Sequence, residues 1–231
     1  MGTGAERRRL RRLEEEALRD LQSTCDLTED AFLYRLRRSR EGRVISIDLE
    51  DRINICALPN SIGQLKALTE LDLFHCVSLT TLPEGFGGLT ALETLILSQC
   101  VSLTILPEGI GGLTALKTLR LSHCFALAAL PDTIGELKSL TKLDLSVCKS
   151  LVALPDSISG LKALKVLDLA ECESLTALPD TICWLTALEE LLLNKSAITA
   201  LPETIVYLKS LTKLDLERCE SLTSLPHALD E

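Results

Sequence analysis

Aliphatic residues, mostly leucine, recur along this chain with a period of 24 residues from Val44 onward. The unit that begins at Leu68 reads LTELDLFHCVSLTTLPEGFGGLTA, and the next unit reads LETLILSQCVSLTILPEGIGGLTA. Both follow the pattern L-x-x-L-x-L-x-x-C-x-x-L-x-x-L-P-x-x-I/F-x-x-L-x-x. A fixed period of this length predicts a solenoid, in which each repeat buries its apolar side against its neighbours.

Eight units align in this register, of which the first is degenerate and the last is incomplete. They start at residues 44, 68, 92, 116, 140, 164, 188 and 211. The sequence therefore predicts one repeat domain over residues 44–231, preceded by a separate segment over residues 1–43.

Each repeat combines a strand pattern with a helix pattern. The L-x-x-L-x-L stretch alternates at period two, which predicts a short strand whose fourth and sixth residues face the core. All eight prolines share one repeat position, where the chain turns into a short helix and a missing N–H is harmless. We therefore expect an α/β solenoid, a horseshoe with a parallel sheet on its concave face and short helices on its convex face.

Six cysteines take the ninth repeat position: Cys76, Cys100, Cys124, Cys148, Cys172 and Cys219. A straight row of thiols one strand apart cannot converge on one metal ion, so we expect free structural thiols. The odd total of nine cysteines, without an apolar leader at the N-terminus, predicts a reducing compartment and a cytoplasmic location.

This pattern resembles the leucine-rich-repeat family over about four fifths of the chain. The C-x-S-L-T-x-L-P-x-x-I-G-x-L form is most similar to repeats of plant intracellular immune receptors and related cytosolic proteins. The resemblance implies a binding module, and it places the cysteines in a buried ladder near the strand ends.

The segment before the repeats predicts an α-helical cap. Residues 5–22 place leucines and an alanine on one stripe, and Asp26 with Glu29 has the form of a capping box. This box predicts a second helix through about Arg40, ended by Gly42. Because a solenoid must cover the core of its first repeat, we expect both helices to do so.

Charge divides the chain into two unequal parts. Residues 1–43 hold eleven Arg and nine acids, or +2, which leaves thirteen basic and twenty-four acidic residues, or −11, in the repeats. An acidic body disfavours nucleic acid and anionic membranes as partners. The Arg-rich first helix offers an alternative docking surface for either, but interleaved acids dilute its charge.

Catalytic signatures are absent from the sequence, which lacks G-x-x-x-x-G-K, H-E-x-x-H, EF-hand and G-x-S-x-G patterns. His75 and His123 lie two strand spacings apart, roughly 10 Å, which is too far to share a metal ion or a proton. We therefore expect no enzymatic activity, no cofactor and no metal site.

The candidate partner site lies on the concave face of repeats two to four. Positions three, five and seven face the hollow, and position eight lies at its rim. Most repeats carry Asp at position five, but repeats three and four carry Ile96 and Arg120. Together with their neighbours they make a candidate interface hot spot of Phe74, His75, Ile96, Gln99, Arg120 and His123.

Acids flank this concave site at Asp72, Asp144 and Asp168. They predict a protein partner with basic character at the edges of the contact. A solvated surface of no function is the alternative interpretation, since outward positions of a repeat are free to vary.

The convex side departs from its pattern at Trp184 and Tyr207, where earlier repeats have Gly, Gln or Glu. Cys183 and Val206 beside them replace the usual Gly, so an apolar patch forms on a side that is otherwise small and polar. Two interpretations stay open: local packing, or a second contact for self-association or a partner.

Two function classes fit these features. One is a recognition module, as in an immune-type receptor or signalling scaffold, and the other is a substrate-selecting adaptor of a larger enzyme such as a ubiquitin ligase. The incomplete last repeat leaves its leucines uncovered, which indicates either a fragment of a longer protein or a C-terminal face covered by a partner or a second copy.

Overall fold

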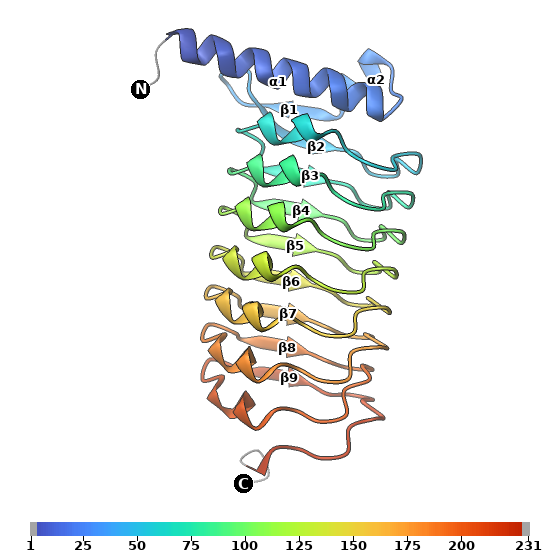
Figure 1. Cartoon of the computed structure of the whole chain (residues 1–231), viewed down its shortest axis with the longest axis vertical. Coiled ribbons are helices and arrows are strands. Elements are labelled where there is room, and N and C mark those ends of the chain that lie inside the picture. The colour runs from blue at the N-terminus through green and yellow to red at the C-terminus, as the bar shows by residue number, and fades with distance from the viewer. Residues whose placement is uncertain (1–3, 228–231) are drawn as a thin grey trace.

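The protein is an elongated stack with its N-terminus and C-terminus at opposite ends, as the computed structural model of residues 4–227 shows (Figure 1). One nine-stranded sheet runs along the stack with its strands in chain order. The strands are β1 (Leu36–Arg38), β2 (Val44–Asp48), β3 (Glu70–Asp72), β4 (Thr94–Ile96), β5 (Thr118–Arg120), β6 (Lys142–Asp144), β7 (Val166–Asp168), β8 (Glu190–Leu192) and β9 (Lys213–Asp215).

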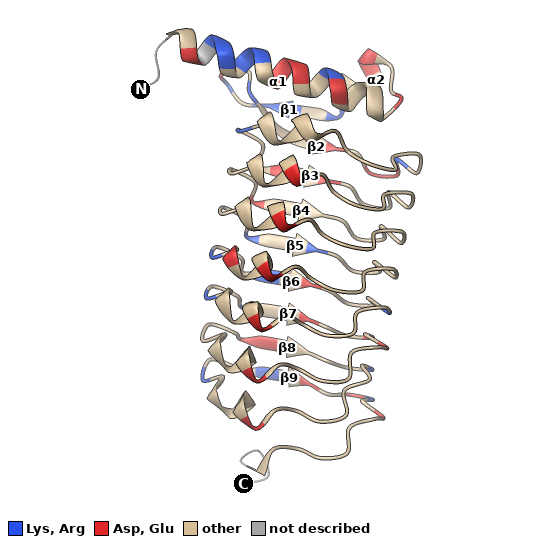
Figure 2. Cartoon of the chain, in the orientation of Figure 1, with Lys and Arg blue, Asp and Glu red and all other residues tan. Residues whose placement is uncertain are grey.

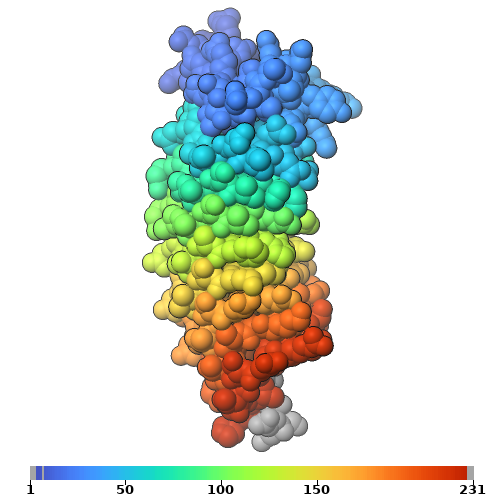
Figure 3. Space-filling model, turned by 90° about the vertical axis from the view of Figure 1, so that its right-hand side faces the viewer, coloured from blue at the N-terminus to red at the C-terminus, as the bar shows by residue number. Residues whose placement is uncertain are grey.

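Strands β2 to β9 pair in parallel and in repeat register, as the sequence predicts. Leu71 pairs with Leu95, and Leu95 pairs with Leu119. Leucines at positions four and six are fully buried through most of the stack, so the core is a set of continuous aliphatic columns. Figure 3 shows the repeats as bands in direct contact along the molecule. Burying each leucine contributes about 2 kcal/mol to the free energy of folding. Because the leucines are buried by stacking on neighbouring repeats, the stacking is the main source of stability.

The convex side carries 3-10 helices of five residues each, a tighter form of the short helices expected from the sequence. They are η1 (Asn60–Gln64), η2 (Glu84–Gly88), η3 (Glu108–Gly112), η4 (Asp132–Glu136), η5 (Asp156–Gly160), η6 (Asp180–Trp184) and η7 (Glu203–Tyr207). Each begins directly after a proline in extended conformation. Five residues are too few for the repeated i to i+4 bonds of an α-helix, whereas a 3-10 helix is used in such short pieces.

Glycines let the first 3-10 helices approach one another closely. A Cβ atom added at Gly87 would overlap the backbone carbonyl oxygen of Gly109 in the next repeat. The same repeat position carries Ser159, Cys183 and Val206 in repeats five to seven. The convex column therefore changes from bare backbone contact to side-chain contact toward the C-terminal end.

The N-terminal cap combines two helices with a strand. Helix α1 (Gly4–Thr24) packs along η1 and buries Ala17, Leu18 and Leu21, and α2 (Glu29–Tyr34) buries Phe32. Most of the basic residues of α1 lie on its first half, and β1 is also basic (Figure 2).

The second cap helix is shorter than the sequence prediction through about Arg40. It ends at Tyr34, and Leu36–Arg38 forms β1, which pairs antiparallel with β2. The N-cap is Thr28, whose hydroxyl accepts from the Ala31 amide at 3.4 Å, in place of the predicted Asp26. Gly42 lies at φ +79° in the turn between the two strands, a conformation that glycine adopts without strain.

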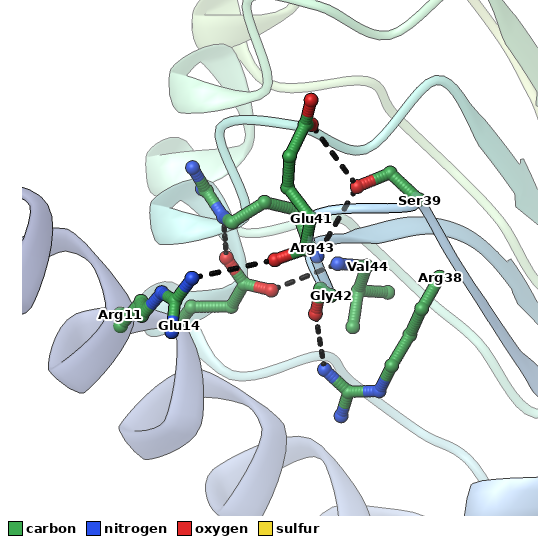
Figure 4. Close-up of polar contacts among 8 residues, drawn as sticks. All are labelled: Arg11, Glu14, Arg38, Ser39, Glu41, Gly42, Arg43 and Val44. Carbon is green, nitrogen blue, oxygen red and sulfur yellow. Dashed lines mark hydrogen bonds and ion pairs between the residues drawn. The ribbon is translucent and has the colours of Figure 1, made fainter.

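A buried ion pair joins the cap to the first repeat (Figure 4). The Glu14 side chain is only 4% exposed, and its carboxylate accepts from the Arg43 guanidinium. Its other oxygen accepts from the backbone N–H of Val44 at 2.8 Å, at the start of β2. The pair therefore holds α1 in one register against the sheet.

The described helices include none that is long and apolar enough to cross a membrane.

Candidate functional site

The register of the sheet brings the predicted concave residues together. Ile96 pairs with Arg120, and Asp72 pairs with Ile96 on its other side, so position five forms one continuous column. Phe74 and Ile96 are half-buried, whereas Arg120 is exposed. An aromatic ring, an aliphatic side chain and a cation thus lie in three adjacent repeats. Protein–protein interfaces are commonly enriched in such residues.

The rim residues at position eight share an unusual backbone conformation. His75, Gln99 and His123 have φ angles of 57°, 63° and 60°, and the equivalent residue of every other repeat is also positive. This conformation directs each N–H to the next repeat, as in the bond from His75 to the carbonyl of Ser98 at 2.9 Å. Nδ1 of His75 also lies 2.7 Å from the carboxylate of Asp51.

Phe125 extends the rim, and sequence reasoning missed it. It is 39% exposed, and its ring lies 5.9 Å from the ring of His123 in an edge-to-face arrangement. Nζ of Lys149 lies 5.9 Å from the same ring. The only signal in the sequence is that an aromatic ring stands at position ten, where repeats two and three have Val.

The acids at position five have a structural role that the sequence did not indicate. The Asp72 carboxylate accepts from the N–H of Phe74 at 2.8 Å, and the Asp168 carboxylate accepts from the N–H of Ala170 at 3.0 Å. Burial raises the pKa of both carboxyl groups above the ordinary value, and these hydrogen bonds oppose the shift. These acids therefore end the strands as well as charging the concave face.

Replacing Asp168 by alanine should lower the free energy of unfolding by about 1 kcal/mol, because the Ala170 N–H loses its acceptor. Asp168→Asn should match or exceed the wild type, since an amide oxygen still accepts and no charge is desolvated. A raised folded pKa means that the charged carboxylate costs stability above that pKa, and that the cost disappears below the ordinary pKa. Urea denaturation should therefore show the Asn advantage at neutral pH and its loss in acid. Equal stability of the Ala and Asn variants would contradict this role.

The six thiols of the cysteine ladder each donate to a backbone carbonyl in the preceding repeat. Sγ of Cys100 lies 3.2 Å from the carbonyl oxygen of Leu73, and Sγ of Cys124 lies 3.2 Å from that of Leu97. Burial raises the pKa of Cys76, Cys100 and Cys172 to about 12. Such thiols are poor nucleophiles, so the ladder is structural.

Reductant and chelator should therefore leave the melting temperature unchanged, because the thiols act as hydrogen-bond donors in the core. Iodoacetamide should modify the exposed Cys56 in the native protein, whereas the five buried ladder thiols, from Cys76 to Cys172, should react only on unfolding. A fall of several degrees with either agent would indicate a cross-link or a structural metal worth a few kcal/mol.

A groove of about 800 Å³ lies on the convex side between η6 and η7. Trp184 and Tyr207 line it and are 58% and 61% exposed, with Asp180 and Lys209 in the same lining. Nζ of Lys162 lies 5.7 Å from the Trp184 ring. The structure thus brings together the two aromatics predicted from the sequence, and packing within the chain leaves most of each exposed.

Among residues 4–227, no three His, Cys, Asp or Glu side chains gather in a group that could hold a metal ion.

The sequence matches the leucine-rich repeat region family over residues 16–150. The chain therefore belongs to the leucine-rich-repeat proteins. Its fold is that of a protein–protein interaction module, a class that is typically non-enzymatic.

Solved structures share this fold. The leucine-rich repeat domain of the type III effector XopL is 26% identical, with a TM-score of 0.67 over 98% of this chain and 87% of that one. The Leptospira interrogans protein LIC12759 is 29% identical, with a TM-score of 0.51 over 76% of this chain. The match spans 58% of the Leptospira protein, less than two thirds of its length.

The Arabidopsis receptor kinase HAESA, solved with a peptide hormone and a co-receptor, is 22% identical. Its TM-score is 0.54 over 90% of this chain and 42% of that one, and this likeness concerns the fold alone. Comparison with curated protein sequences gives no match.

Proposed function

We propose that this chain is a cytoplasmic recognition module that holds a protein partner on its concave face, across repeats two to four. The observation that carries the proposal is the sheet register, which places Phe74, Ile96 and Arg120 in three adjacent repeats. The rim residues His75, Gln99 and His123 border them, and Phe125 adds a further exposed ring. Aromatic and Arg side chains commonly dominate the binding energy of interfaces.

The flanking acids support a partner with basic groups at the edges of the contact. Asp72, Asp144 and Asp168 stand on both sides of Ile96 and Arg120 in the same column. Binding to them should weaken as salt concentration rises, because partly exposed charges are screened.

The repeat type supports a role of immune-receptor or signalling kind, and the free thiols support a reducing compartment. An adaptor that selects substrates for a larger enzyme would use the same concave face. The two roles differ in whether the assembly that contains the chain also contains a catalytic subunit.

Site-specific photo-crosslinking tests the face directly. A benzophenone amino acid at Gln99, on the rim, should capture the partner in cells, and mass spectrometry would identify it. The same amino acid at Val152, which is 60% exposed outside the concave face, is the control. Capture of the same proteins from Val152 but not from Gln99 would overturn the proposal, and an enzyme subunit among the captured proteins would favour the adaptor.

The convex groove supports self-association with a second copy of the chain. A twofold contact sets the same surface of each copy against the other, so Asp180 of one copy can pair with Lys209 of the other. Trp184→Ala should then reduce the dimer fraction in sedimentation velocity, and Asp180→Lys should reduce it further. A sedimentation coefficient unaltered by both changes would assign the two aromatics to packing within the chain.

A further inference from the structure

Every aspartate at position five caps the strand end of its own repeat. The carboxylate accepts from the backbone N–H two residues later, at distances between 2.8 and 3.1 Å. The five capped pairs are Asp48 with Glu50, Asp72 with Phe74, Asp144 with Ser146, Asp168 with Ala170 and Asp215 with Glu217. The structure thus shows, five times, which chemical group this N–H binds.

The thiol ladder takes the backbone carbonyl at position six of the preceding repeat. The carbonyl of Leu121, for example, accepts from the thiol of Cys148 at 3.2 Å. The N–H of Ser146 in the same repeat as Cys148 turns instead to the carboxylate of Asp144 at 3.1 Å. Where position five is not an aspartate, this N–H makes no such bond, and the place of the carboxylate is left to another acceptor.

Repeat four lacks the cap and has a cation in its place. Position five is Arg120, and the Ser122 N–H makes no hydrogen bond among residues 4–227. Arg120 is exposed and forms no salt bridge within that part of the chain, although its charge attracts the Asp72 carboxylate. The Ser122 hydroxyl donates to the hydroxyl of Ser98 at 2.8 Å, and Ser98 is only 7% exposed, so a nearly buried hydroxyl group lies next to Ser122.

We propose that the Ser122 N–H and the Arg120 guanidinium bind a side-chain carboxylate of the partner, which supplies the group that aspartate supplies in the neighbouring repeats. Charge-assisted hydrogen bonds of this kind are about twice as strong as neutral ones. The inference rests on the proposed function, because it requires the partner to lie on the concave face.

The other uncapped repeats do not offer the same chemistry. Position five is Ile96 in repeat three and Leu192 in repeat seven, and neither provides a cation. The flanking Asp72 and Asp144 repel a free anion, so a carboxylate that carries its own neighbouring cations fits best. The partner segment is therefore an acidic residue between basic residues.

Amide NMR of the ¹⁵N-labelled chain tests this with a blocked tripeptide, acetyl-Lys-Asp-Lys-amide, and its acetyl-Lys-Asn-Lys-amide twin at constant ionic strength. The Asp peptide should move the Ser122 amide proton downfield in a saturable way, as expected for a new bond to a carboxylate. The Asn twin should move it far less, because its amide oxygen can accept from the N–H but forms no ion pair with the Arg120 guanidinium. Arg120→Gln should weaken the apparent affinity about tenfold.

Arg120→Asp is the matched control variant, because it gives repeat four the same cap as its neighbours. It should fold normally, show the Ser122 amide already downfield, and abolish the response to the Asp peptide. An equal response to both peptides, an unmoved Ser122 amide, or an undiminished response in Arg120→Asp would each overturn the carboxylate site. The crosslinking from Gln99 does not depend on the carboxylate site. It therefore tests the proposed function independently of these peptide experiments.

Discussion

Replacing Glu14 by alanine should lower the free energy of unfolding by about 4 kcal/mol, because it leaves the Arg43 guanidinium as an unpaired charge at a buried junction. It also removes the acceptor of the Val44 N–H at the first parallel strand. Urea denaturation measures the loss, and hydrogen exchange of the Val44 amide locates it. The cap should open before the remaining repeats, since each repeat contacts only its neighbours.

Arg12→Ala in the same helix is the control for this prediction. Arg12 pairs with Glu16 at 2.9 Å, but its side chain is 81% exposed, so its loss should leave the free energy of unfolding nearly unchanged. If Glu14→Ala were as stable as Arg12→Ala, with the Val44 amide still protected, the buried pair would not be what joins the cap to the sheet.

Replacing Gly87 by serine should lower the free energy of unfolding by about 3 kcal/mol, because its Cβ would overlap the backbone carbonyl of Gly109 and force η2 away from η3. Backbone cannot move aside as a flexible side chain can. The same urea titration measures the change, and circular dichroism confirms that the variant retains its fold at low denaturant.

The reciprocal exchange, Ser159→Gly, places glycine at the same repeat position in repeat five. It should change the free energy of unfolding by no more than about 1 kcal/mol, the conformational cost of glycine. Equal effects of the two exchanges would mean that the convex column is not limited by backbone contact.

The repeat architecture was predictable because one period controls every layer. Leu71, Leu95 and Leu119 repeat the same core position, and Pro83 and Pro107 mark the same turn into a convex helix. When local pattern and stacking demand the same geometry, sequence and structure agree.

The cap was less predictable because its segments have no repeat to fix their register. Asp26 and Glu29 match a capping box, but the Arg35 that follows α2 leads into a strand that pairs with Val44–Asp48. The exposed sheet edge selects that strand over a longer helix, a tertiary effect that a local pattern cannot show. The burial of Glu14 also depends on tertiary packing. Its local sequence, a run of three glutamates, gives no sign of which one is buried.

The concave candidate residues could be placed from period two alone, and the register brings them together. The hydrogen bonds of the aspartate column could not be predicted, because they depend on which backbone N–H lacks a partner at the strand end. Phe125 was missed because only positions three, five, seven and eight were expected at the hollow or its rim, whereas its ring at position ten lies beside His123.

The affinity of the crosslinked partner for two concave variants shows whether the concave face binds it. Phe74→Ala and Arg120→Ala should each weaken binding by more than about 1 kcal/mol, which is roughly fivefold in Kd. Lys213→Ala, on the exposed sheet position of the last repeat, should bind as the wild type does. Wild-type affinity in both concave variants, with their fold intact, would place the partner elsewhere on the solenoid and overturn binding at repeats two to four.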